Sequence, residues 1–178
     1  MTPTEVEGGQ TSSIKVTLDG PAPAGGKIVD LSSDQPYALP PSQVTVPAGQ
    51  TFVNANVTTS VVAADGTATI TGGGKTTTLK VYKPLTSVLS PRTATIQGGS
   101  SIMLKVILSR PAPAGGLVAT LSDKTSVITT PPSVTIQAGA REALFLVASN
   151  PVAAKKSATV YVTVQGKAGR TAVLTITP

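Results

Sequence analysis

The segment Gly20–Gly26, with the sequence Gly-Pro-Ala-Pro-Ala-Gly-Gly, returns ninety residues later as Arg-Pro-Ala-Pro-Ala-Gly-Gly at Arg110–Gly116. With the same offset, residues 8–70 and 98–160 share 24 identities in 63 positions. Repetition at one fixed offset is typical of tandem structural modules. We therefore predict two copies of one domain, residues 1–84 and residues 85–178, joined near Pro84.

The composition of the chain favours strands over helices. The sequence contains 27 Thr and 21 Val but only 3 Glu, and its 17 Gly and 15 Pro fall mostly in short clusters. Thr and Val are branched at Cβ and pack well on a pleated sheet, whereas Gly and Pro supply the turns between strands. An all-β chain is the expected result.

Apolar and polar residues alternate within short segments of each copy. In the second copy Ile102, Leu104, Val106 and Leu108 are expected to point inward, and the first copy matches them with the inward set Ile14, Val16 and Leu18. About seven short antiparallel strands in some 90 residues is the pattern of an immunoglobulin-like β-sandwich. The predicted core of the second copy consists of Val106, Leu108, Leu121, Phe145, Val147 and Val160.

Several short motifs together resemble a known family. They are the Pro-Ala-Pro-Ala-Gly-Gly repeat, the run Leu85–Pro91, the related segments Val44–Gly49 and Val134–Gly139, and the closing Thr175–Pro178. The chain resembles tandem bacterial immunoglobulin-like modules of large secreted and cell-surface proteins. The resemblance implies extracellular display and a spacer, stalk or adhesive role, and it carries no catalytic or binding residue. We therefore predict a structural module of a stalk, filament or adhesin that acts as a semi-rigid spacer. Its expected partners are neighbouring copies of the same module, in cis or as a head-to-tail polymer.

The two copies differ at their beginnings. Pro3–Glu7 aligns with Thr93–Gln97, so the counterpart of Leu85–Leu89 would precede Met1. Two interpretations stay open: the chain was cut from a longer array, or a neighbouring chain donates the strand and the modules assemble by strand complementation. The last hairpin is also four or five residues longer in the second copy.

The residue inventory excludes most catalytic sites. The sequence has no His and no Cys, which removes Ser-His-Asp triads, cysteine nucleophiles and the usual zinc ligands. Gly72–Thr76 lacks the upstream glycine and the helix of a phosphate-binding loop and is expected to be a hairpin turn. Ser12 and Lys15 would face opposite sides of a strand, and Asp30 and Asp34 are an isolated acidic pair. We predict no enzyme, no cofactor and no metal site.

No segment is long enough to insert into a membrane. The longest apolar run, Ala143–Ala148, has six residues, whereas a spanning helix needs about 20. The polar and acidic first ten residues do not form a signal peptide, so the expected secreted or cell-surface location rests on the family resemblance. Asn56–Thr58 is a glycosylation sequon that matters only in a glycosylating host.

Charge is distributed unevenly between the copies. Residues 1–84 carry 5 basic and 6 acidic groups, a net charge of −1, and residues 85–178 carry 9 basic and 2 acidic groups, a net charge of +7, which sum to +6. A basic domain suits an alternative function as a binding module for a glycan or an anionic cell-wall polymer. Nucleic acid is not expected, because the chain has few aromatic side chains for stacking. The aromatic candidates for a glycan site are Tyr37, Phe52, Tyr82 and Tyr161.

The charge asymmetry also predicts a contact between the domains. The last strand of the first copy would end beside Asp34 and Asp65. The second copy would begin at the end of its sandwich where the turns carry Arg and Lys residues. The short link Lys83–Leu85 should then bring an acidic end against a basic one. The basic candidates are Arg110, Arg141, Lys167 and Arg170.

Overall fold

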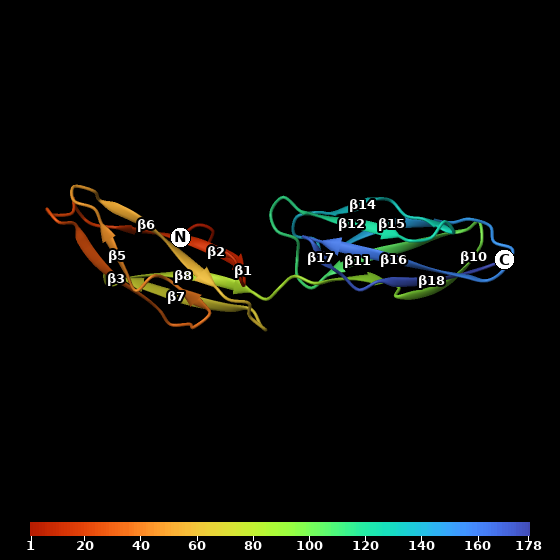
Figure 1. Ribbon diagram of the computed structural model, residues 1–178, viewed down its shortest axis with the longest axis horizontal. Coiled ribbons are helices and arrows are strands. Elements are labelled where there is room, and N and C mark those ends of the chain that lie inside the picture. Colours follow the sequence, from red (N-terminus) through yellow and green to blue (C-terminus); the bar gives the residue numbers. More distant parts are fainter. The chain divides into compact units, whose positions relative to one another are not determined.

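The computed structural model describes all 178 residues and is built from strands and loops. The chain divides into two compact units, Met1–Pro84 and Leu85–Pro178. Each unit is a sandwich of two sheets (Figure 1), and each has its own apolar core. The expectation of an all-β chain is confirmed.

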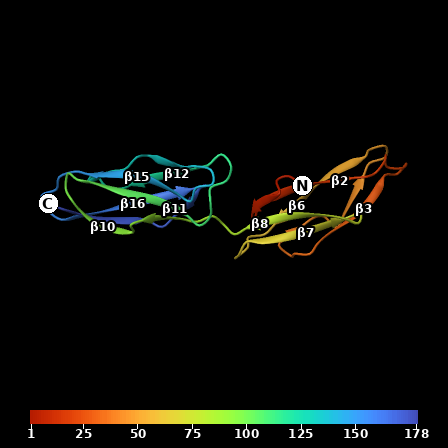
Figure 2. The same ribbon diagram turned by 180° about the vertical axis from the view of Figure 1, so that it is seen from behind.

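The first domain contains one five-stranded and one three-stranded sheet. The strand order is β1-β8-β7-β3-β5 in the first sheet and β2-β6-β4 in the second. Figure 2 shows β7 and β8 of the first sheet and β2 and β6 of the second from behind. The strands are β1 (Glu5–Glu7), β2 (Thr11–Thr17), β3 (Lys27–Ser33), β4 (Ala38–Leu39), β5 (Gln43–Val46), β6 (Phe52–Thr59), β7 (Gly66–Gly72) and β8 (Lys75–Tyr82).

The second domain repeats this plan with one additional strand in each sheet. The order is β10-β18-β16-β12-β14, with β17 beside β16, in one sheet and β13-β15-β11-β9 in the other. Its strands are β9 (Ser87–Ser90), β10 (Thr93–Gln97), β11 (Ser101–Leu108), β12 (Leu117–Asp123), β13 (Ile128–Thr129), β14 (Ser133–Ile136), β15 (Glu142–Ser149), β16 (Lys156–Val164), β17 (Lys167–Ala168) and β18 (Ala172–Thr177). The chain thus consists of two tandem immunoglobulin-like β-sandwich domains.

The apolar alternation places the core of the second domain as predicted. Successive side chains of a strand point to opposite faces of its sheet, so one apolar set from each sheet meets in the middle of the sandwich. Ile102 is only partly buried, whereas Leu104 is fully buried. All six predicted core residues are buried, with exposed fractions of 5% or less: Val106, Leu108, Leu121, Phe145, Val147 and Val160.

The expectation that all strands are antiparallel was wrong at one strand pair in each domain. β1 pairs with β8 in parallel, and β10 pairs with β18 in parallel. β10 does not fold back on β9 through a hairpin, and it joins the opposite sheet beside the last strand of the domain. A pairing between the first and last strands of a domain leaves no mark in the local apolar pattern, which is why the sequence did not indicate its direction.

The repeated Gly-Gly pair has a structural reason at its second position. Gly26 and Gly116 have φ angles of +83° and +75°, in the left-handed region that favours glycine. A Cβ atom would lie 2.8 Å from the carbonyl oxygen of Val46 at Gly26, and 2.7 Å from that of Ile136 at Gly116. The turn therefore excludes a side chain in both copies.

Substitution of Gly116 by alanine should destabilise the second domain. We expect a loss of about 1–3 kcal/mol in the free energy of unfolding, because alanine at this φ is strained and its Cβ meets a backbone carbonyl. Gly115→Ala is the matched control: its φ is +92°, but a Cβ there would have no neighbour within 4 Å. Urea unfolding of both variants measures the difference, and equal losses would show that the close approach to Ile136 adds nothing.

Candidate functional site

The opening strand of the second domain shows how the edge of this sandwich is closed. β9 lies antiparallel to β11, with Ser87 opposite Leu108 and Leu89 opposite Val106. Ser87 and Leu89 point inward and have exposed fractions of 4% and 0%. Leu85, just before the strand, is also buried. The alternation of this short segment therefore completes the core of its domain.

The first domain has no strand in the corresponding place. β2 is the edge strand of the sheet β2-β6-β4, and outside that sheet it is joined only by the isolated bridge between Thr2 and Ser13. The segment Glu5–Glu7 does not take the vacant place, because it forms β1 beside β8, as β10 lies beside β18. In the structure, the only backbone pairing on this outer edge of β2 is the bridge to Thr2, and the lack of an opening strand in the first copy stays a prediction.

The vacancy leaves apolar side chains of the first domain partly open. Val16 and Leu18 are half-buried, whereas their counterparts Val106 and Leu108 have exposed fractions of 0% and 3%. Both side chains point inward as predicted and pack against the core of the first domain. They stay half-buried because no strand lies beside them in the way that β9 lies beside Val106 and Leu108.

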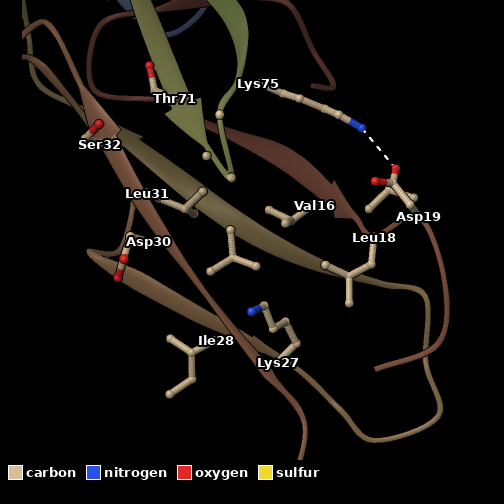
Figure 3. Close-up of a pocket in the computed structure, with 15 residues that line it drawn as sticks. Val16, Leu18, Asp19, Lys27, Ile28, Asp30, Leu31, Ser32, Thr71 and Lys75 are labelled. Atoms are coloured by element: carbon tan, nitrogen blue, oxygen red, sulfur yellow. Dashed lines mark hydrogen bonds and ion pairs between the residues drawn. The ribbon is translucent and has the colours of Figure 1, made fainter. Parts of the chain in front are cut away.

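These side chains border a groove of about 600 Å³ between the two sheets of the first domain. Val16 and Leu18 come from one sheet and Leu31 from the other, and Figure 3 shows their side chains around the hollow. A second hollow lies along the same strand, where Met1, Ile14 and Ile70 join the lining. The sequence alignment located the missing strand, but it identified neither the groove nor the lining residues contributed by Lys27–Ser32 and Thr71–Lys75.

The backbone of β2 presents unused pairing positions to this groove. Both the N–H and the C=O of Ser13 bond with Thr2 on the outer edge of β2. Since a strand alternates its pairing edge every second residue, Lys15 and Thr17 direct their backbone groups to that same edge. No strand lies beside them there. An open edge of this kind is a template for the addition of another strand.

One ion pair crosses the rim of the groove. Lys75 Nζ lies 3.3 Å from Asp19 Oδ1 (Figure 3), and the two side chains have exposed fractions of 76% and 97%. Exposed pairs of this kind contribute little stability, because water and salt screen them. The pair therefore presents no strong barrier to a ligand that enters the groove.

The two domains also differ in the loop that bonds to the other edge of β9. In the second domain the N–H of Arg170 donates to the carbonyl of Ser87 at 2.9 Å, and the N–H of Leu89 donates to the carbonyl of Arg170 at 3.0 Å. In the first domain the shorter hairpin pairs Lys75 with Gly72 instead. A strand added to the first domain would therefore find its hydrogen-bonding partner in β2.

The acidic residues proposed for the interdomain contact lie at one end of the first domain. Asp34 Oδ1 accepts a hydrogen bond from the N–H of Thr69 at 2.7 Å, and Asp65 Oδ1 accepts one from the N–H of Lys83 at 2.9 Å, where β8 ends. Both carboxylates thus stabilise loops of their own domain. Their contact with the second domain stays a prediction.

The basic residues proposed for the same contact gather at the end of the second domain where β9 begins. Arg110 follows β11, and Arg141 precedes β15 and accepts a backbone bond from Leu108. Lys167 belongs to β17, and Arg170 bridges Val88. Arg141, Lys167 and Arg170 are exposed, and Arg110 is partly exposed.

The aromatic residues considered for a glycan site lie on different elements. Phe52 begins β6, and Lys15 Nζ lies over its ring, 4.0 Å from the ring centroid. Tyr82 ends β8 in the other sheet, and its side-chain hydrogen bond is the main cause of the raised pKa of Lys80. Tyr161 lies in the second domain, and Lys124 Nζ lies over its ring, 5.1 Å from the ring centroid. Tyr37 lies before β4, and a Cβ added to Gly66 would meet its hydroxyl.

The remaining polar and glycine motifs have structural roles: Ser12 Oγ donates a hydrogen bond to the carbonyl of Pro3, and Asp30 accepts one from the side chain of Gln43. Gly73 and Gly74 form the turn between β7 and β8, as the sequence predicts. The structure holds no group of three or more acidic, His or Cys side chains arranged to bind a metal ion. It also contains no helix with the length and apolar character needed to cross a membrane.

The comparisons with known proteins concern the fold alone. No protein-family model matches the chain, and no curated protein matches its sequence. Among solved structures, the chain is similar to the ectodomain of the teleost fish polymeric Ig receptor, with 14% sequence identity over 98% of this chain and 95% of that chain and a TM-score of 0.33. The immunoglobulin-like architecture described above rests on the sheets of this chain itself.

Proposed function

We propose that the chain is a non-enzymatic structural module of an extracellular stalk, filament or adhesin on a secreted or cell-surface protein. The observation that carries this proposal is the repetition of one sandwich within the chain, with the same sheet order around two separate cores. Repeated domains in a row lengthen a protein without adding a new kind of site. Neighbouring copies of the module are the proposed partners.

The link between the domains supports a role as a semi-rigid spacer. Only residues 83–86 separate the end of β8 from the start of β9. Pro84 restricts its own φ angle, and the N–H of Lys83 is held by Asp65. Both features reduce the number of conformations that the link can adopt. A spacer of this type holds whatever follows it at a distance from the surface.

Small-angle X-ray scattering tests the spacer role. We expect an extended pair of domains with a narrow range of interdomain angles at low salt. Arg110→Glu combined with Arg170→Glu should broaden that range, because the reversed charges would repel Asp34 and Asp65 where the parent side chains attract them. A paired substitution of two exposed lysines away from this end, Lys155→Glu with Lys156→Glu, controls for the change in net charge.

Two results would contradict different parts of the proposal. Domains folded back side by side would reject the spacer. Identical angle distributions in the parent chain and in the Arg110→Glu/Arg170→Glu variant would reject the charged contact and leave the spacer intact.

Strand complementation is the proposed way in which modules join end to end. The vacant place beside β2 supports it, because the second domain closes the equivalent place with β9, a strand of four residues. Head-to-tail joining through such a strand would extend the row beyond one chain.

A further inference from the structure

We propose that the groove of the first domain is an acceptor site for one extended peptide strand, donated by a separate polypeptide and carrying the pattern Leu-x-Ser-x-Leu. The assignment rests on the proposed joining of modules by strand complementation and specifies its site, register and ligand. The second domain supplies the template, because its own Leu85–Leu89 shows which side chains close this fold.

The register of the added strand follows from the internal repeat. In the second domain, β9 places Ser90 opposite Lys105, Leu89 opposite Val106, and Val88 opposite Ile107. The offset of ninety residues transfers these partners to Lys15, Val16 and Thr17. The bridge between Thr2 and Ser13 already occupies the next pairing position along the same edge. The strand therefore runs antiparallel to β2 and ends beside Met1.

The side-chain preferences of the site follow from its lining. The inward leucine opposite Val16 enters the space bordered by Val16, Leu18 and Leu31. Val16 and Leu18 are only half-buried there, whereas Leu31 is already buried. Its burial removes apolar surface from water and supplies the main driving force. The backbone groups of Lys15 and Thr17 add directional hydrogen bonds. A charged residue at the leucine position would bury no apolar surface, and the loss of its hydration would weaken binding.

The donor is a strand that is not already folded into a domain. The Leu85–Ser90 segment of a second copy has its leucines buried, and its withdrawal would open the core of its own domain. A free strand carries no such cost. The burial of these leucines therefore favours a free segment of the same alternation as the donor, and exchange between two copies of this chain is the competing result.

Peptide binding to the full chain tests the site. The probe is a fluorescently labelled peptide of the sequence Leu-Thr-Ser-Val-Leu-Ser-Pro, copied from Leu85–Pro91. We expect saturable binding by fluorescence anisotropy, and at least tenfold weaker binding when aspartate replaces the second leucine. Equal binding of both peptides, or no binding, would overturn the proposal.

A tethered strand locates the binding site. The residues Leu-Thr-Ser-Val-Leu-Ser, added directly before Met1, would reach the same register, because the final serine falls opposite Lys15. This extension should raise the melting temperature of the first domain and abolish binding of the free peptide. The matched extension Leu-Thr-Ser-Val-Asp-Ser should do neither. Undiminished peptide binding to the first extended chain would place the peptide elsewhere and reject the groove.

The oligomeric state separates the remaining outcomes. A chain that dimerises in sedimentation experiments and does not bind the peptide would assign the groove to strand exchange with a second copy, and would overturn the free-strand donor. Scattering by the chain alone does not involve the groove. An extended, monomeric chain without peptide binding would therefore reject the acceptor site and leave the proposed spacer in place.

Discussion

Replacement of Phe145 by alanine is expected to lower the free energy of unfolding of the second domain by about 3–5 kcal/mol. Phe145 is the one phenylalanine of this domain, and its side chain lies in the core with an exposed fraction of 5%. The substitution removes the buried ring and leaves a cavity that neighbouring strands cannot fill without moving. Urea unfolding followed by circular dichroism measures the loss.

The neighbouring residue and the first domain provide two controls for this substitution. Leu144 precedes Phe145 on β15, points the other way and is 61% exposed, so Leu144→Ala should change stability much less. The first domain has Ala55 at the position equivalent to Phe145 and should unfold unchanged in both variants. Equal losses for Leu144→Ala and Phe145→Ala would show that the inward and outward faces of β15 have been assigned wrongly.

Leu89→Ala should destabilise the second domain by about 2–5 kcal/mol. Leu89 is fully buried although it belongs to a strand of only four residues at the edge of the sheet. Its loss would weaken the hold of β9 on the domain and expose Val106 and Leu108, which β9 covers. The variant should therefore bring the second domain closer to the state of the first, in which Val16 and Leu18 are half-buried.

A comparison of the thermal unfolding midpoints of Leu89→Ala and Val88→Ala tests whether β9 is part of the core of the second domain or only links the two domains. Val88 lies on the same strand, points outward and is only partly buried, so its truncation should have the smaller effect. If neither variant changed the unfolding midpoint, β9 would contribute nothing to the second domain, and the template for the acceptor groove would be lost.

The repeat and the alternation were sufficient to predict most of the fold. The fixed offset aligned two modules, and inward positions such as Leu121 and Val160 followed from the period of two that every strand obeys. The Gly73-Gly74 turn also followed from local chemistry, since glycine accepts the positive φ angles of a tight hairpin. These features depend on neighbours in sequence, and a single chain displays them directly.

The sequence by itself thus determined the two modules, most of their strands and their inward faces, and it predicted that the first module lacks a counterpart of Leu85–Leu89. Only the tertiary structure decided that the strand Glu5–Glu7 runs parallel to β8, that Val16 and Leu18 remain half-buried, and that a groove opens between them and Leu31. The physical reason is that pairing direction and burial depend on strands that are distant in sequence. Val16 and Leu18 have the same local pattern as Val106 and Leu108, and their different burial comes from whether another strand covers them.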